Sequence, residues 1–259
     1  MSSPGAAKRW LLRSAIRHAE RKFALNGLHP QLPLVIPVRE EFSFANFLSD
    51  GNDAALAGLK GLTVGDNNDD AYIYLWGKSG VGVSHLLQAT CQQASEQGMS
   101  AIYLPMTEIM SLDPQLLVNM ESVALVCIDD IECVAGSSTW QEALFHLFNR
   151  IKQNRTALVV AAHQVPRQCG IELQDLVSRL ASGVTYQIRE LSDIGKQALL
   201  QQRGRRVGLE LSDEVCRYLL NRAERGVPGL LQILERLDRN ALSSRRKITI
   251  PFVRDIMGW

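Results

Sequence analysis

The sequence lacks any long hydrophobic run, and no stretch approaches the roughly 20 apolar residues that cross a bilayer as a helix. We therefore expect no membrane-spanning segment and no membrane partner. Cysteine is also scarce: the five cysteines are scattered, odd in number and nowhere in C-x-x-C spacing. This pattern indicates reduced thiols rather than a disulfide framework, and so predicts a cytoplasmic protein.

Net charge is almost absent. The 28 basic and 27 acidic residues leave a formal charge of +1, which argues neither for nor against a nucleic-acid partner. The hydrophobic content of 46% and the charged content of 21% are ordinary for a soluble globular chain. A length of 259 residues is sufficient for one α/β domain and a smaller second domain.

Acidic residues are nearly missing from residues 1–30, where Glu20 is the single acid among six lysines and arginines. The apolar residues between these charges could form one helical face, as in a transit-like or membrane-surface helix. A solvated helix, or a leader upstream of the start codon in use, explains the same composition. These alternatives stay open.

Residues 30–38, PQLPLVIPV, contain Pro30, Pro33 and Pro37, which exclude a helix and favour extended backbone. A glutamine ahead of spaced aliphatic side chains suits a peptide bound in a groove on a partner protein. An edge strand or a linker fits the composition equally well. The residues that such a groove would hold are Gln31, Leu32, Leu34, Val35 and Ile36.

Apolar, strand-like runs alternate with helical patterns between residues 72 and 191. Because the strands are almost continuously apolar, they predict a five-stranded parallel sheet that is covered on both faces, the architecture of a P-loop α/β domain. The predicted strands are 72–76, 100–104, 124–129, 156–162 and 184–191, and the predicted helices between them are 86–96, 107–123, 139–153 and 173–181.

Strands stop after residue 191, and three helical patterns follow at 193–206, 213–224 and 227–243, with a short extended piece and one more helical turn in the tail. Ser212 stands where the middle helix needs an N-cap. These patterns predict a small helical lid domain. The expected domains are an extended leader at 1–37, the nucleotide-binding α/β domain at 38–191 and the lid at 192–259.

The segment 72–88, YIYLWGKSGVGVSHLLQ, has the pattern of a strand, a glycine-rich turn and the start of a helix. Backbone N–H groups exposed in such a turn attract phosphate together with the positive end of the helix dipole. The segment therefore predicts a phosphate-binding loop, although a glycine turn of this kind also occurs without a ligand. The nucleotide-binding residues that it predicts are Gly77, Lys78, Ser79, Gly80, Val81, Gly82, Val83, Ser84 and His85.

The loop departs from the pattern G-x-x-x-x-G-K-S/T at one position. Gly77 and Gly82 fill the glycine positions and Ser84 supplies the magnesium-binding hydroxyl, but Val83 replaces the lysine that contacts the β and γ phosphates. A charge-assisted contact of roughly 1.5 to 3 kcal/mol is therefore missing. Lys78 lies inside the loop and could approach a phosphate from another side.

Two acids, Asp129 and Asp130, end the predicted strand 124–129. In P-loop proteins one carboxylate after a buried strand holds magnesium and a neighbouring polar group positions the attacking water. We therefore predict both acids as catalytic residues and Asp129, with Ser84, as a magnesium ligand. Solvated strand ends also carry paired acids, but the order of these two after a phosphate loop favours the nucleotide role.

Two further residues stand at positions where P-loop proteins control hydrolysis. His163 follows the fourth predicted strand, where a polar side chain senses the γ-phosphate, although a lone histidine is also a common structural residue. Arg179, in LVSRLASG, lies on the short predicted helix before the fifth strand. An arginine there can reach the phosphate held by a neighbouring subunit, and an ordinary exposed arginine fits the composition as well.

These segments together resemble the AAA+ proteins of the DnaA family, and among them the regulatory inactivators of the Hda type. The resemblance covers roughly residues 31–259. Because the sequence ends at Trp259, we expect no helix-turn-helix DNA-binding domain, which favours the Hda type. The segments that carry the resemblance are GKSGVGVSHLL, LVCIDDIECVAG, LFHLFNRI, DLVSRL, LERLDRNAL and KITIPFVRDI.

The resemblance implies a regulator of replication initiation. Proteins of the Hda type bind the β sliding clamp of the replicative polymerase through a glutamine-led segment, which falls on residues 31–36, and reach DNA only through the clamp. They stimulate hydrolysis of DnaA-bound ATP and so prevent re-initiation. The resemblance places the finger arginine at Arg179 and a DnaA-facing segment at Phe145 and Asn149. It also implies ADP or ATP with magnesium, and is compatible with a homo-oligomer.

Three phosphate-handling positions depart from the family pattern: Val83 replaces a lysine, His163 replaces an acid, and Pro228 stands where a lid arginine reaches the phosphates. We therefore expect weak or no ATP hydrolysis by the chain itself, with ADP as a structural ligand. The competing interpretation is an active AAA+ ATPase of the helicase-loader type, against which Val83 and Pro228 argue. A DNA-binding initiator is disfavoured because we expect no helix-turn-helix domain, and the near-neutral charge does not point to one.

Overall fold

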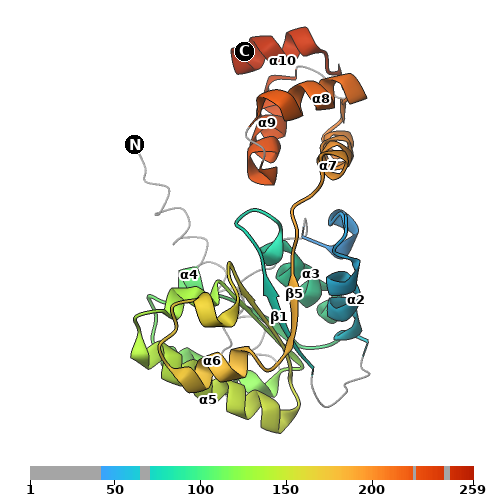
Figure 1. Cartoon of the computed structure of the whole chain (residues 1–259). Coiled ribbons are helices and arrows are strands. Elements are labelled where there is room, and N and C mark those ends of the chain that lie inside the picture. Colours follow the sequence, from blue (N-terminus) through green and yellow to red (C-terminus); the bar gives the residue numbers. More distant parts are fainter. Residues whose placement is uncertain (1–41, 65–70, 224–225, 242–245) are drawn as a thin grey trace. The chain divides into compact units, whose positions relative to one another are not determined.

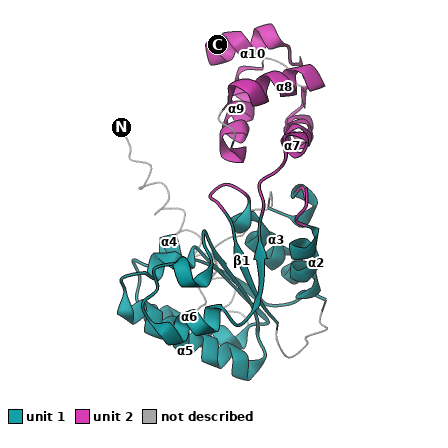
Figure 2. Ribbon diagram, in the orientation of Figure 1, with its two compact units in different colours: residues 1–47, 53–77, 82–188 teal, residues 48–52, 78–81, 189–259 magenta. Residues whose placement is uncertain are grey.

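The computed structural model describes residues 42–64, 71–223, 226–241 and 246–259. The basic leader and the predicted clamp-binding residues 31–36 lie outside these ranges. The described chain divides into two compact units (Figure 2). The first is drawn from residues 42–47, 53–77 and 82–188, and the second from residues 48–52, 78–81 and 189–259.

A five-stranded parallel sheet forms the centre of the first unit, which confirms the predicted sheet. The strand order is β2-β3-β4-β1-β5, so the strand that precedes the glycine turn lies between β4 and β5. Every residue of β3 and β4 is buried, as the uninterrupted apolar runs predict. The strands are β1 (Tyr72–Trp76), β2 (Ala101–Pro105), β3 (Leu125–Asp129), β4 (Ala157–Ala162) and β5 (Val184–Gln187).

Helices cover both faces of this sheet (Figure 1). On one side lie α2 (Asp53–Gly61) and α3 (Val83–Glu96), and on the other α5 (Ser138–Asn154) and α6 (Gln174–Leu180). Tyr74, which is fully buried, packs into the core under α5 and α6. The shorter elements are η1 (Phe44–Asn46), α4 (Met106–Ile109), η2 (Pro114–Leu117), η3 (Met120–Ser122), η4 (Ile131–Val134) and η5 (Pro166–Gln168).

The single helix predicted at 107–123 is wrong. The chain forms α4 and then the two separate 3-10 turns η2 and η3. Pro114 cannot continue a helix, and the Asp113 carboxylate accepts the Gln115 N–H at 2.8 Å, which starts η2 afresh. Leu117 and Met120 are nevertheless buried, and their spacing produced the helical pattern.

The fifth strand is shorter than predicted, because β5 ends at Gln187 rather than at residue 191. Ile188 makes one more strand-like bond, in which its N–H donates to the Trp76 carbonyl at 2.7 Å. At Arg189 the backbone N–H and carbonyl bond to the side-chain amide of Asn52 instead of to a neighbouring strand. This amide accepts the Arg189 N–H at 2.8 Å and donates to the Arg189 carbonyl at 3.2 Å.

The second unit is the predicted helical lid. The Ser212 hydroxyl accepts the Val215 N–H, which confirms this serine as the N-cap of the middle helix. Leu230, Leu234 and Leu237 form a buried stripe on the last of the three predicted helices. The tail carries a helix of eight residues rather than one turn. The elements are α7 (Asp193–Arg206), β6 (Leu209–Glu210), α8 (Asp213–Arg222), α9 (Val227–Asn240), β7 (Arg246–Lys247) and α10 (Ile250–Met257).

No helix in the described ranges combines the length and the apolar content that a membrane crossing requires.

Candidate functional site

The predicted phosphate loop is the segment between β1 and α3. Gly80 and Gly82 have φ values of +83° and +100°, in the left-handed region that favours glycine. The Val81 N–H donates to the Lys78 carbonyl at 3.3 Å and closes a turn between them. The helix begins at Val83, and Gly82 supplies no side-chain cap to its first N–H groups. Backbone N–H groups and the dipole at the start of such a helix favour an anion.

Two contacts of loop residues lie within the second unit. The Lys78 ammonium is 3.8 Å from the Glu190 carboxylate, and both side chains are largely exposed, so the pair is weak. Pro228, the residue at the lid-arginine position, packs against Gly80: a Cβ added to Gly80 would lie 2.7 Å from Pro228 Cγ. A proline carries no charge, so this contact cannot stabilise a phosphate as an arginine would.

His85, which the sequence assigns to nucleotide binding, makes structural contacts as well. Its Nε2 lies 2.9 Å from the Ser43 carbonyl oxygen. The ring also packs against Phe42 and Phe47, with ring centroids 5.1 and 5.5 Å apart. His85 therefore ties the chain before and after η1 to the first turn of α3.

Asp129 is buried at the end of β3 and held by two donors. The Tyr103 hydroxyl donates to Oδ2 at 2.6 Å, and the Asp130 N–H donates to Oδ1 at 3.1 Å. Burial, and then the Asp129 charge, raise the pKa of Tyr103, so its hydroxyl stays protonated as the donor. Each carboxylate oxygen keeps a second acceptor position. Carboxylate and hydroxyl oxygens are ligands that magnesium takes, so the chemistry of Asp129 and of the exposed Ser84 is compatible with this ion.

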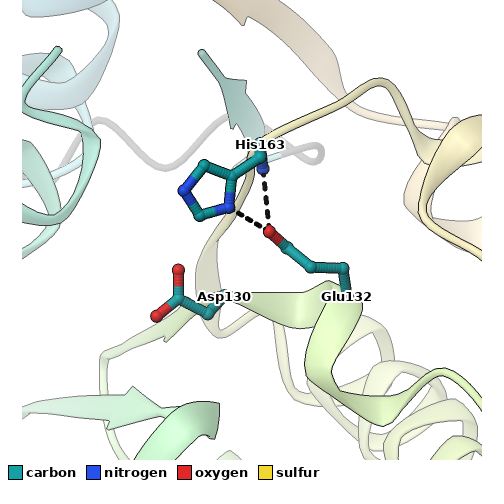
Figure 3. A group of neighbouring side chains, drawn as sticks. All are labelled: Asp130, Glu132 and His163. Atoms are coloured by element: carbon teal, nitrogen blue, oxygen red, sulfur yellow. Dashed lines mark hydrogen bonds and ion pairs between the residues drawn. The ribbon is translucent and has the colours of Figure 1, made fainter. Parts of the chain in front are cut away.

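Asp130, Glu132 and His163 meet at the adjacent ends of β3 and β4 (Figure 3). One ligand atom from each lies within 4.8 Å of the others. The His163 N–H donates to Glu132 Oε1 at 3.1 Å, and ring Nδ1 forms an ion-paired hydrogen bond with the same oxygen. This hydrogen bond raises the pKa of His163. Burial, and then the charges of Asp129 and Glu132, raise the pKa of Asp130.

Glu132 is the residue of this cluster that the sequence analysis missed. It lies two positions after Asp130, on η4, and 31 residues before His163. Both strands were predicted, but the contact depends on β3 and β4 being neighbours in the sheet, which only the structure shows. His163, predicted as a sensor of the γ-phosphate, is thus engaged by an acid of its own chain.

Arg179 lies in the last turn of α6 and is half-buried. Its carbonyl accepts the Ser182 hydroxyl at 2.7 Å, which closes the helix end. Its guanidinium makes no hydrogen bond or ion pair with any residue that the structure describes. Among the described residues, none competes with a partner molecule for this guanidinium.

Phe145 and Asn149 are one turn apart on α5 and both half-buried. The Phe145 ring packs on the core and against His146, with ring centroids 5.6 Å apart. Their common face on α5 is compatible with the DnaA-facing role, which stays a prediction.

Gln141, also missed from the sequence, holds the chain that leads into α6. It is buried in the first turn of α5. Its Oε1 accepts the N–H groups of Glu172 and Leu173 at 3.0 and 2.9 Å, and its Nε2 donates to the Val134 carbonyl at 3.1 Å. The helix that carries Arg179 is thereby anchored at its N-terminal end.

Two family models match the chain in succession. Residues 38–187 match the bacterial DnaA ATPase domain, and residues 193–257 match the Hda lid domain. The matches follow the order of the sheet unit and the helical unit.

Solved structures of DnaA proteins share the fold. Domain III of Thermotoga maritima DnaA is 17% identical with a TM-score of 0.73, over 86% of this chain and 98% of that one. A replication initiator DnaA bound to AMPPCP and single-stranded DNA is 24% identical with a TM-score of 0.65. That match covers 76% of this chain and 65% of the other, so the chain spans less than two thirds of that DnaA.

A third structure, described as a DNA replication initiation factor, is 25% identical with a TM-score of 0.66, over 79% of this chain and 67% of that one. The DnaA ATPase model alone matches more than half of the 259 residues. The order of the two matched models is also that of an ATPase domain followed by its lid. The chain therefore belongs to the bacterial DnaA family of AAA+ proteins, and its lid is of the Hda type.

Proposed function

We propose that this chain regulates replication initiation by stimulating the hydrolysis of DnaA-bound ATP to ADP while it is held on the sliding clamp. The observation that carries the proposal is the Arg179 guanidinium at the end of α6, which makes no hydrogen bond or ion pair with the residues that the structure describes. Such an arginine can stabilise the charge on a phosphoryl group that a neighbouring molecule transfers. The changes at Val83 and Pro228 support an activator of another protein's ATPase rather than an independent ATPase.

The proposed ligand of the chain itself is ADP, with magnesium. The left-handed glycines of the loop and the uncapped start of α3 support a phosphate site, and a related DnaA was solved with AMPPCP. Ser84 and Asp129 would hold the magnesium, which would neutralise phosphate charge when bound. With Pro228 in place of the lid arginine, the chain supplies fewer charges for hydrolysis, so we propose that ADP is a structural ligand.

Restoring the loop lysine tests this nucleotide site. Val83→Lys is expected to tighten ADP and ATP binding by roughly ten- to a hundredfold, because it returns a charge-assisted phosphate contact of about 1.5 to 3 kcal/mol. The measurement is a fluorescence titration with a labelled nucleotide. Val81→Lys, which adds the same charge within the loop, is the matched control. Equal tightening in both variants would contradict a specific role for position 83.

The proposed clamp contact is the segment at residues 31–36. Its support is the sequence pattern of a glutamine followed by spaced aliphatic residues. Replacing Gln31 and Leu34 together by alanine is expected to weaken retention on immobilised clamp by roughly tenfold or more, because a buried leucine alone contributes about 1.5 to 3 kcal/mol. Leu28→Ala, upstream of the prolines, is the control and should bind normally. Unchanged binding by the double variant would place the clamp contact elsewhere.

The function itself is tested by phosphate release from ATP-bound DnaA in the presence of DNA-loaded clamp. We expect the chain to accelerate release only when clamp is present, and to release almost no phosphate from ATP in the absence of DnaA. Steady turnover of ATP by the isolated chain would instead support the helicase-loader class of ATPase.

A further inference from the structure

The cluster of Asp130, Glu132 and His163 has the composition of a metal site that magnesium does not explain (Figure 3). It offers two carboxylates and one imidazole within the first unit. Magnesium takes oxygen ligands, whereas imidazole suits zinc, cobalt, nickel and copper. The presence of His163 therefore changes which cation this edge of the sheet prefers.

We propose that Asp130, Glu132 and His163 bind a divalent transition-metal ion of the zinc type, at a site separate from the magnesium assigned to Ser84 and Asp129. The ligand atoms lie within 4.8 Å of one another. Around one zinc ion, with metal–ligand distances of about 2.0 to 2.2 Å, tetrahedral ligand atoms lie roughly 3.3 to 3.6 Å apart. Metal binding would require the partly exposed His163 and Glu132 side chains to rotate.

The two carboxylate oxygens of Glu132 differ in their hydrogen-bond partners. Oε1 accepts the His163 backbone N–H and also bonds to His163 Nδ1, so the backbone bond would keep this oxygen in place if the imidazole turned to a metal ion. Oε2 is buried and makes no hydrogen bond to any residue in the described ranges. A buried carboxylate oxygen without a donor is costly, and a cation is the partner that satisfies it.

The negative charges of the carboxylates at this site also favour a bound cation. Asp130 and Glu132 place two carboxylates beside the His163 imidazole, and Asp129 directly precedes Asp130 in the sequence. A divalent cation would neutralise the charges of the Asp130 and Glu132 carboxylates. Three protein ligands leave at least one coordination position for water.

The test uses the full chain without nucleotide, so its outcome is independent of the proposed function. Co²⁺ and Zn²⁺ are titrated in competition with a chromophoric chelator. We expect one equivalent of Co²⁺ to bind with visible d–d absorption and no sulfur-to-cobalt band in the near ultraviolet, and Zn²⁺ to displace it. His163→Gln and Glu132→Gln are each expected to weaken binding by roughly tenfold or more while melting as the unaltered protein does.

Control variants remove four other candidate ligands. Binding should persist in His146→Gln, in the double variant His18→Gln with His29→Gln, and in Cys133→Ser. The proposal is overturned if no stoichiometric metal binds, if His163→Gln binds normally, or if a control variant loses the metal instead. Displacement of Co²⁺ by Mg²⁺ as readily as by Zn²⁺ would also overturn it, because His163 would then contribute no selectivity.

Discussion

Replacing Arg179 by alanine is expected to reduce the clamp-dependent stimulation of DnaA-bound ATP hydrolysis by roughly a thousandfold, to the unstimulated rate. The proposed reason is that the guanidinium neutralises charge on the phosphoryl group as it is transferred in the neighbouring molecule. Arg179 is half-buried in the last turn of α6 and makes no bond within the described chain that its loss would break. The variant should therefore fold normally.

The measurement is single-turnover phosphate release from ATP-bound DnaA on DNA-loaded clamp. Arg167→Ala, which removes an exposed arginine of the same unit, is the matched control and should stimulate normally. Arg179→Lys should restore little, because an ammonium lacks the planar pair of donors that a phosphate accepts. Full stimulation by Arg179→Ala would remove the finger role, and an equal loss in Arg167→Ala would indicate a general charge effect.

The sequence predicted well those elements whose pattern of apolar residues is compatible with only one structural arrangement. The fully apolar runs that became β3 and β4 have no exposed face, so a parallel sheet covered on both sides was the available arrangement. The helix predicted at 107–123 failed for a local reason, since Pro114 and the Asp113 cap outweigh an apolar spacing that two 3-10 turns satisfy equally well. β5 is shorter than predicted because the backbone N–H and carbonyl of Arg189 form hydrogen bonds with the Asn52 side-chain amide rather than with a strand.

Only those parts of the candidate site that lie within short sequence motifs could be predicted. The glycine turn and the acids at the end of β3 are visible in short motifs, whereas the pairing of Glu132 with His163 joins residues 31 positions apart. It depends on β3 and β4 being neighbours, and strand order is not contained in periodicity. Gln141 was missed for a similar reason, because a glutamine in an amphipathic helix gives no sign that backbone groups 31 and 32 residues away bond to it.

Replacing Gln141 by alanine is expected to lower the free energy of unfolding by roughly 2 to 4 kcal/mol. The change leaves the N–H groups of Glu172 and Leu173 and the carbonyl of Val134 without their partner, at a position that is only 1% exposed. The measurement is urea unfolding followed by circular dichroism. Gln153→Ala removes the same side chain from an exposed position of α5, and should change the free energy by less than about 0.5 kcal/mol.

The same substitution also tests whether Gln141 positions α6, in addition to its contribution to the stability of the fold. Glu172 and Leu173 precede α6 directly, and Arg179 lies at its other end, so loosening the anchor should misplace the guanidinium under conditions where the chain stays folded. We expect Gln141→Ala to lower the maximal stimulated rate of DnaA-bound ATP hydrolysis several-fold while clamp retention is unchanged. A variant that loses stability but keeps the full maximal rate would show that Gln141 supports the fold alone and that α6 positions Arg179 by its packing through Leu176 and Leu180.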